Sequence, residues 1–462
     1  MRICDRWLVR TALPLFVLFP ITAAGPPLTK DDGYRGIWYM NQPSGDEYHY
    51  KYSGGMATYP QQHVPIAIYS KEVNKTFFCY GGTTKGRREL LHMVSYFDHA
   101  TGRVPRPTIL LNKKTDDAHD NPTIQIDRQG HIWIFSSAHG TARPSYIHRS
   151  KRPYSVDEFE LIVKTNFSYT QPWYLPSKGF LFLHTRYAAG RGLFWITSQD
   201  GVEWSEPQPL AKIALGDYQI SWSDGDRVGT AFDYHPHPLG LNARTNLYYL
   251  ETTDRGQTWK TADGRSAHLP ITEPQNAALV HDYESVKLLV YLKDLQFDSR
   301  GQPVILYLTS RGYASGPASD PRVWHTAHWS GERWEIRRFT TSDHNYDHGP
   351  LYIDPDGSWQ IIAPTEPGPQ PYGTGGEMVL WSSRDEGKTW TKVKQLTRDS
   401  PKNHTYARRP LHAHPDFYAL WADGNAFEPS ESFLYFTSRT ADHVWRLPAQ
   451  MPDDFARPDV VW

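Results

Sequence analysis

Two eight-residue segments of the chain, TTDRGQTW (252–259) and SRDEGKTW (383–390), share the pattern S/T-x-D-x-G-x-T-W. A copy one residue shorter, SQDGVEW, spans 198–204, and a degenerate copy, HWSGERW, spans 328–334. In this turn motif, the Asp box, the carboxylate binds backbone N–H groups and the tryptophan packs between neighbouring sheets. The closing tryptophans, which are 55, 75 and 56 residues apart, are Trp204, Trp259, Trp334 and Trp390. Sheet units repeated at this spacing predict a β-propeller.

Between these turns the chain consists of short alternating segments. TIQIDRQGHIWIFSS and LQFDSRGQPVILYLTS each place apolar residues at every second position around a turn, and 34 glycines and 36 prolines recur throughout. Almost no segment has a helical apolar period. We therefore predict an all-β fold and a single propeller domain over residues 25–462. At roughly 60 residues per repeat, seven blades fit this length best, with six as the alternative.

The first 24 residues are predicted to be a signal peptide. Three arginines precede the apolar run 12–21, and the small residues 22–24 follow it. This run is too short to span a bilayer, so we expect an exported protein, secreted or periplasmic.

Composition excludes several classes of protein. Cys4 falls in the predicted signal peptide, so Cys79 has no intrachain partner, and neither a disulfide nor a cysteine-based zinc site is expected. The formal net charge of −1 gives no basic field for nucleic acid or for an anionic membrane. The chain has 17 tryptophans and 28 tyrosines, which suit sugar stacking and all-β cores alike. We expect a monomer.

A histidine stands at each end of the hairpin HDNPTIQIDRQGHIWIFSSAHG (119–140). Residues that face each other in an antiparallel hairpin are equidistant from the turn centre, and His119 and His139 are equidistant from Gln129. A regular hairpin would therefore bring both imidazoles to one end, with Cβ atoms about 5 Å apart.

The next hairpins extend this pattern along one rim of the predicted ring. Tyr169 and Arg186 are equidistant from the centre of the turn 176–179, so we predict that they face each other. One hairpin further on, the strand after the turn 224–226 returns to His235, and Arg244 opens the strand that follows. Two arginines, a tyrosine and several histidines are thus expected on one face.

This combination suits β-elimination at a 4-linked uronic acid. That reaction needs a cation to neutralise the C6 carboxylate, a base for the C5 proton and an acid for the leaving O4. We predict His119, His139, Tyr169 and Arg186 as catalytic, and His235 and Arg244 as substrate-binding. A sialidase would instead need a Tyr–Glu nucleophile pair, and a retaining glycosidase two close carboxylates. No spacing in the chain singles out either pair.

Several longer segments, including DAHDNPTIQID, SYTQPWYL, LHTR and NHTYARRPLHAHPDFYALWADG, resemble the BNR-repeat family of seven-bladed polysaccharide lyases. That family includes ulvan lyases and L-rhamnose-α-1,4-D-glucuronate lyases, and the resemblance implies a secreted lyase acting at a uronic acid. It implies the same histidines, tyrosine and arginines, and Arg408 is added as a substrate-binding candidate. A non-catalytic carbohydrate-binding propeller is a lesser alternative.

Some relatives are described as α-L-rhamnosidases that hydrolyse the rhamnosyl-glucuronate linkage with one histidine on the opposite face. The resemblance implies that His63 would have this role if the chain were such a hydrolase. A structural calcium or zinc ion also occurs in such propellers. No histidine spacing here forms a metal signature, so we predict no metal site. The histidines considered were His235, His237, His344, His404 and His412.

Overall fold

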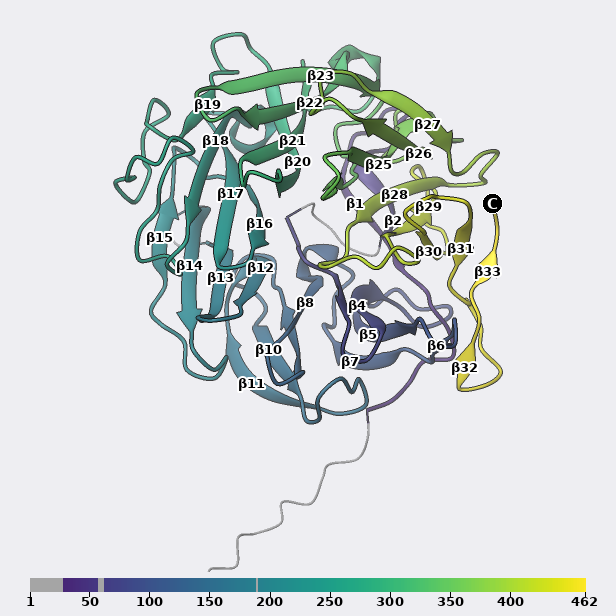
Figure 1. Cartoon of the computed structure of the whole chain (residues 1–462). Helices are drawn as coiled ribbons and strands as arrows, with labels where there is room; N and C mark the ends of the chain where they lie inside the picture. The colour runs from purple at the N-terminus through teal and green to yellow at the C-terminus, as the bar shows by residue number, and fades with distance from the viewer. Residues whose placement is uncertain (1–27, 57–61, 188–189) are drawn as a thin grey trace, which may run out of the picture.

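Seven antiparallel sheets stand as blades around a central axis (Figure 1). The computed structural model describes residues 28–56, 62–187 and 190–462, so the predicted signal peptide lies outside the described residues. Helical structure in this part of the chain is limited to three 3₁₀ turns, η1 (Ala118–Asp120), η2 (Gly240–Ala243) and η3 (Pro317–Ser319). None of them is long and apolar enough to cross a membrane. The predicted all-β propeller with seven blades is confirmed.

The strands of each blade follow one another in the chain from the axis outward (Figure 1). Blade 1 consists of β3 (Ala67–Ser70), β4 (Lys75–Gly82), β5 (Leu91–Asp98) and β7 (Thr108–Asn112). Blade 2 consists of β8 (Pro122–Ile126), β9 (Ile132–Ser136), β10 (Ser145–Ser150) and β11 (Phe159–Thr165). Blade 3 consists of β12 (Ser168–Leu175), β13 (Gly179–Arg186), β14 (Gly192–Ser198) and β15 (Gln208–Ala211). Blade 4 consists of β16 (Gln219–Asp224), β17 (Arg227–Tyr234), β18 (Thr245–Thr252) and β19 (Leu279–His281).

The remaining blades have the same order. Blade 5 consists of β20 (Leu289–Phe297), β21 (Pro303–Ser310), β22 (Arg322–Trp329) and β23 (Trp334–Ser342). Blade 6 consists of β24 (Leu351–Ile353), β25 (Trp359–Glu366), β26 (Glu377–Ser383) and β27 (Thr391–Gln395). Blade 7 consists of β28 (Asn403–Arg408), β29 (Ala419–Gly424), β30 (Leu434–Thr437), β31 (Val444–Arg446) and β33 (Asp459–Val460).

The core lies between the blades. Middle strands such as β21 and β22 are buried at every position, because a neighbouring sheet covers each of their faces. Apolar residues therefore occupy both faces of these strands, whereas β27 at an outer edge is exposed throughout.

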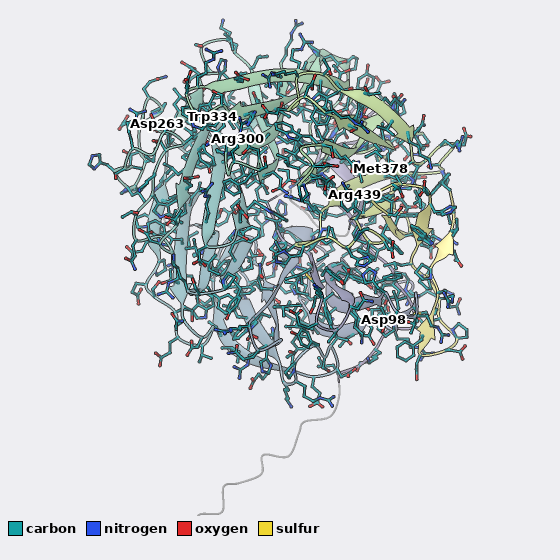
Figure 2. The ribbon with its side chains drawn as sticks, viewed as in Figure 1. Asp98, Asp263, Arg300, Trp334, Met378 and Arg439 are labelled. Carbon is teal, nitrogen blue, oxygen red and sulfur yellow. The ribbon has the colours of Figure 1, made fainter. Side chains whose placement is uncertain are left out.

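The Asp boxes join the third strand of a blade to its fourth. In blade 4, both the backbone N–H and the hydroxyl of Thr258 donate to the Asp254 carboxylate, at 2.9 and 2.6 Å. Trp259 packs against Trp195 of blade 3, with ring centroids 5.5 Å apart. In the degenerate copy, Trp334 packs against Tyr249 of the preceding blade at 5.5 Å and lies toward the outer side of the ring (Figure 2). The motif thus fixes the spacing between blades, as predicted.

The first and last blades close the ring without a covalent link. Near the C-terminus, β32 (Phe455–Ala456) pairs with β6 (Val104–Pro105), beside blade 1. Before blade 1, β1 (Ile37–Pro43) and β2 (Tyr50–Met56) form a separate ribbon (Figure 1). This ribbon packs on blade 7, where Gly55 meets the backbone of Asp423 so closely that a Cβ would not fit.

Candidate active site

His119 and His139 lie together at one end of the first hairpin of blade 2. Strand pairing of Pro122 with Ser136 gives the register centred on Gln129 that the sequence predicted. Chain direction alone therefore brings the two imidazoles to the same rim. Their rings stack with centroids 3.9 Å apart and an interplanar angle of 16°.

Asp117 holds both histidines. One of its carboxylate oxygens accepts a hydrogen bond from Nδ1 of His119 at 2.5 Å, and the other accepts one from Nδ1 of His139 at 2.8 Å. Each Nδ1 therefore carries its proton toward Asp117, which leaves the Nε2 lone pair of each ring for other partners.

The two histidines differ in access. His119 is buried, with Nδ1 2.8 Å from the Tyr39 hydroxyl and Nε2 3.2 Å from the Tyr52 hydroxyl. The side chain of His139 is 34% exposed, and among the described residues its Nε2 has no hydrogen-bond partner. His139 is consequently the histidine that an incoming ligand can reach.

Electrostatics favour a neutral His119 and an anionic Asp117. Burial lowers the pKa of His119 more than Asp117 raises it, so His119 is neutral at neutral pH. Burial acts to raise the pKa of Asp117, but the interactions with His119 and His139 outweigh it and hold this pKa well below its usual range. An anionic Asp117 that is hydrogen-bonded to His139 is the arrangement that orients a general base.

Arg143 holds the carboxylates of Asp117 and Asp120 in place. Its guanidinium donates to Asp117 at 3.1 Å and to Asp120 at 2.8 Å. Asp120 in turn accepts the backbone N–H of His139 at 2.7 Å. The loop after β9 is therefore tied to η1 by charge-assisted hydrogen bonds.

Tyr169 reaches the histidines through a bulge in β12. The strand register shifts between Ser168 and Gln171, and Tyr169 has a left-handed backbone with φ of 52°. Its ring centroid lies 6.2 Å from that of His119, and its hydroxyl is 3.2 Å from the hydroxyl of Tyr187. Burial raises the pKa of both phenols, so both keep their protons at neutral pH.

The predicted pairing of Tyr169 with Arg186 is wrong. Leu175 pairs with Gly179, so the hairpin is centred on Ser177, half a residue before the expected centre, and the bulge then shifts the register again. Ser168, not Tyr169, pairs at this end of the hairpin, and its partner is Thr185. Arg186 ends β13 and places its guanidinium 5.9 Å from the ring centroid of Phe194. Among the described residues, no contact joins Arg186 to the histidine pair.

Arg191 occupies the position that was expected for Arg186. Its Nε donates to the hydroxyl of Tyr187 at 3.3 Å, and its guanidinium lies 4.7 Å from the ring centroid of Tyr218. Arg244 approaches the same Tyr218 ring at 4.8 Å and donates to the hydroxyl of Tyr346 at 3.1 Å. No described carboxylate lies within ion-pair distance of either arginine. Both guanidinium groups can therefore pair with an acidic ligand.

Lys51 is a third basic side chain at this place, contributed by β2. It is buried and donates a hydrogen bond to the side chain of Asn242. Burial, with the nearby charges of Arg244 and Arg191, lowers the pKa of Lys51 to about 6. An acidic ligand would favour the protonated, cationic form of Lys51.

His235 lies within the same cluster, as predicted. Its Nδ1 is 3.5 Å from a guanidinium nitrogen of Arg191, and its ring centroid is 4.8 Å from that of Tyr218. Burial lowers the pKa of His235 well below its usual value, and the neighbouring cations lower it further. It is therefore a neutral neighbour of the arginines.

His63 lies on the same rim as His119, so the idea that it could serve the opposite face is wrong. His63 comes shortly before β3, and His119 comes shortly before β8. These are the innermost strands of blades 1 and 2, and the innermost strands all start at the same rim. Its ring centroid is 5.7 Å from that of Tyr169.

Arg408 lies outside this cluster, at the end of β28 in blade 7. It is buried beside His348, with 2.6 Å between a guanidinium nitrogen and Nε2. Burial lowers the pKa of Arg408 to about 9. Together with Lys293 and Trp222 it lines a small internal cavity.

A cavity of about 600 Å³ opens on the opposite rim. The turns that end the innermost strands line it, including Asp224 of blade 4 and Asp354 of blade 6, together with Trp222 and Arg409. None of the predicted site residues is among the described residues that line this cavity.

The residue types at the histidine pair could also ligate a metal. Ligand atoms of Asp117, His119 and His139 lie within 4.8 Å of one another. Both Nδ1 atoms, however, already donate to Asp117, so hydrogen bonding accounts for the cluster. Among the described residues, no group of three or more potential metal ligands includes His235, His237, His344, His404 or His412.

Sequence reasoning missed several residues of this cluster. Asp117 had a signal, since it lies two positions before His119 in the motif DAHDN. Tyr187 and Arg191 lie just after the end of β13, outside the hairpin whose ends were counted. Lys51 and Tyr52 come from a ribbon whose position no local pattern reveals.

The chain is similar in sequence to BNR-repeat proteins and to ulvan lyases. Residues 106–342 match the model described as "BNR repeat-containing family member". An ulvan lyase of Nonlabens ulvanivorans is 23% identical over 351 residues, covering 67% of this chain and 72% of the relative. An ulvan lyase of Alteromonas sp. (strain LOR) is 23% identical over 364 residues, covering 70% and 72%.

Solved structures share the architecture. A PL25 ulvan lyase aligns with a TM-score of 0.69 at 18% identity, covering 89% of this chain and 96% of that one. The same kind of lyase has been solved bound to -[GlcA(1-4)Rha3S]-. The polysaccharide lyase Uly1 aligns with a TM-score of 0.61 at 12% identity, covering 90% and 99%. At these identities the likeness supports the propeller fold.

Proposed function

Because this chain belongs to the BNR repeat-containing family, we propose that it is a polysaccharide lyase that cleaves at O4 of a uronic acid by β-elimination. The observation that carries the proposal is the pairing of an accessible histidine, held by Asp117, with two arginines that lack carboxylate partners among the described residues. The ulvan lyases among its relatives support the reaction class.

The first task in this reaction is to neutralise the substrate carboxylate. Arg191 and Arg244, with Lys51 beside them, would bind the C6 carboxylate, since both guanidinium groups lie over Tyr218 and the Lys51 pKa responds to both of them. Neutralising this charge acidifies the C5 proton, because the carbanion can then delocalise into the carboxyl group.

Proton transfer follows. Nε2 of His139 would take the C5 proton, and Asp117 would stabilise the imidazolium that forms by accepting the Nδ1–H hydrogen bond. Tyr169 and Tyr187, linked by their hydroxyls, would supply the proton for the leaving O4. His119, buried and bonded to Tyr39 and Tyr52, would position Asp117 and His139.

The proposal includes export of the enzyme by the signal peptide predicted at residues 1–24. An extracellular location would give access to polymers too large to enter a cell. We propose that the enzyme acts as a monomer, since the cluster is assembled from residues of one chain.

Product analysis tests the reaction class. The purified enzyme is incubated with ulvan, gum arabic or glucuronoxylan, and the fragments are analysed by mass spectrometry. Elimination yields a fragment that is lighter by one water than the corresponding hydrolysis product and carries a C4–C5 double bond. Saturated fragments from all three polymers, with intact glucuronate, would contradict the proposal and favour a hydrolase such as an α-L-rhamnosidase.

A further inference from the structure

A second cluster of metal-ligand side chains lies at the joint between the first and last blades. His99 follows β5 of blade 1, and His414 and Asp416 lie between β28 and β29 of blade 7. Ligand atoms of these three residues are within 4.8 Å of one another. Figure 2 labels Asp98, directly before His99, on the side where blade 1 meets the C-terminal strands.

One ring nitrogen of His99 has no hydrogen-bond partner among the described residues. Its Nε2 lies 2.8 Å from the hydroxyl of Thr76, which can accept its proton. Its Nδ1 is buried and has no hydrogen-bond partner in the described structure. A metal-ligating histidine characteristically donates its other ring N–H to a fixed acceptor, and Thr76 provides one.

His414 faces His99 across the joint. The ring centroids are 3.7 Å apart, and Tyr69 packs against both rings, at 5.4 Å from His99 and 4.8 Å from His414. The Nδ1 of His414 accepts the backbone N–H of Asp416 at 3.1 Å and lies 3.8 Å from its carboxylate. Two imidazoles and a carboxylate thus converge from two blades.

We propose that His99, His414 and Asp416 bind a zinc ion that clamps blade 1 to blade 7. Two imidazole nitrogens and one carboxylate oxygen form a donor set that zinc accepts, with water as a fourth ligand. Binding through Nδ1 of His414 would exchange its hydrogen bond from Asp416 for a metal–nitrogen bond.

The position of the site gives the ion a structural role. The neighbouring connection between these blades consists of backbone hydrogen bonds, from Tyr69 N–H to the Leu411 carbonyl at 2.9 Å and from Leu411 N–H to the Ala67 carbonyl at 2.8 Å. The ring has no covalent closure, so an ion at this joint would resist its opening.

Zinc binding is measured with chelator-treated, full-length mature protein, by titrating zinc chloride alone against a competing chromogenic chelator. We expect one tight site in the wild type, weakened at least about tenfold in His414→Ala and in Asp416→Asn. Added zinc should raise the melting temperature of the wild type and leave that of His414→Ala unchanged. Asp416 is exposed, so Asp416→Asn keeps the fold and decides the outcome if His414→Ala does not fold.

His139→Ala is the matched control, because Asp117, His119 and His139 form the other described group of potential ligands. We expect this variant to keep the tight site. The proposal is overturned if the wild type takes up no stoichiometric zinc, or if His139→Ala removes the site while His414→Ala and Asp416→Asn retain it.

Discussion

Asp117 determines which nitrogen of each histidine is available for proton transfer. By accepting both Nδ1–H groups, it directs the Nε2 of His139 toward the exposed side of the cluster. The chemistry of the site therefore depends on a residue that contacts no substrate in the proposed mechanism.

Substituting Arg191 and Arg186 separately tests which of the two arginines binds the substrate carboxylate. Arg191→Ala should lower kcat/KM by roughly 10²-fold or more, because a cation that neutralises the developing charge is lost. Arg186→Ala is the matched control: it removes the same side chain at a strand end that lies beside Phe194, and it should retain near wild-type activity. Steady-state kinetics on a uronic-acid polysaccharide distinguish them, and a reversed order of effects would restore Arg186 to the site.

Lys51 predicts a pH dependence of stability. Its pKa is about 6 in the folded protein and returns to its ordinary value near 10.5 on unfolding. Between these values the unfolded state binds more protons, so this group makes the free energy of unfolding rise with pH. Lys51→Met should flatten that rise and increase the melting temperature at pH 7.

Scanning calorimetry at two pH values, near 7 and near 9, checks this prediction. Lys85→Met, which alters an exposed lysine, should keep the wild-type pH dependence. If Lys51→Met and the wild type gain equal stability between the two pH values, then Lys51 is charged in the folded protein.

At the scale of elements, the hairpin was the most predictable unit. The tight turn around Gln129 preserves register, so the pairing of the two histidines follows from counting residues. The hairpin of β12 and β13 fails the same count because its turn is centred on Ser177, half a residue from the expected centre, and because Tyr169 lies in a bulge. Tyr406 in β28 adopts a similar left-handed backbone at a register shift, and neither bulge has a glycine to reveal it.

Removing an Asp-box tryptophan should lower the stability of the protein without changing its catalytic activity. Trp259 is 2% exposed and packs on Trp195 of the preceding blade, so Trp259→Ala should lower the free energy of unfolding by about 3–5 kcal/mol. Activity per folded molecule should stay near the wild-type value. Chemical denaturation measures the first quantity.

The exposed Leu161 provides the comparison, and Leu161→Ala should change stability little. A loss of activity in Trp259→Ala that exceeds its unfolded fraction would mean that blade spacing also governs the site.

At the scale of the whole molecule, the repeat spacing predicted both the propeller and its seven blades. The membership in the BNR-repeat family was likewise predicted from the motifs and is confirmed. The contribution of β2 could not be predicted, because the ribbon is held by blade 7, which lies more than 300 residues away in the chain. Lys51 and Tyr52 reach the histidine face only through this long-range contact.

The account's central claim is that the face carrying His139 performs β-elimination. It is tested most directly by following the ultraviolet absorbance of a uronic-acid polysaccharide with the wild type and with His139→Ala. We expect a steady rise from the new conjugated double bond in the wild type and a rate roughly 10²–10⁴-fold lower in the variant, with both proteins equally folded. A flat trace for the wild type, or equal rates for the two proteins, would contradict the claim.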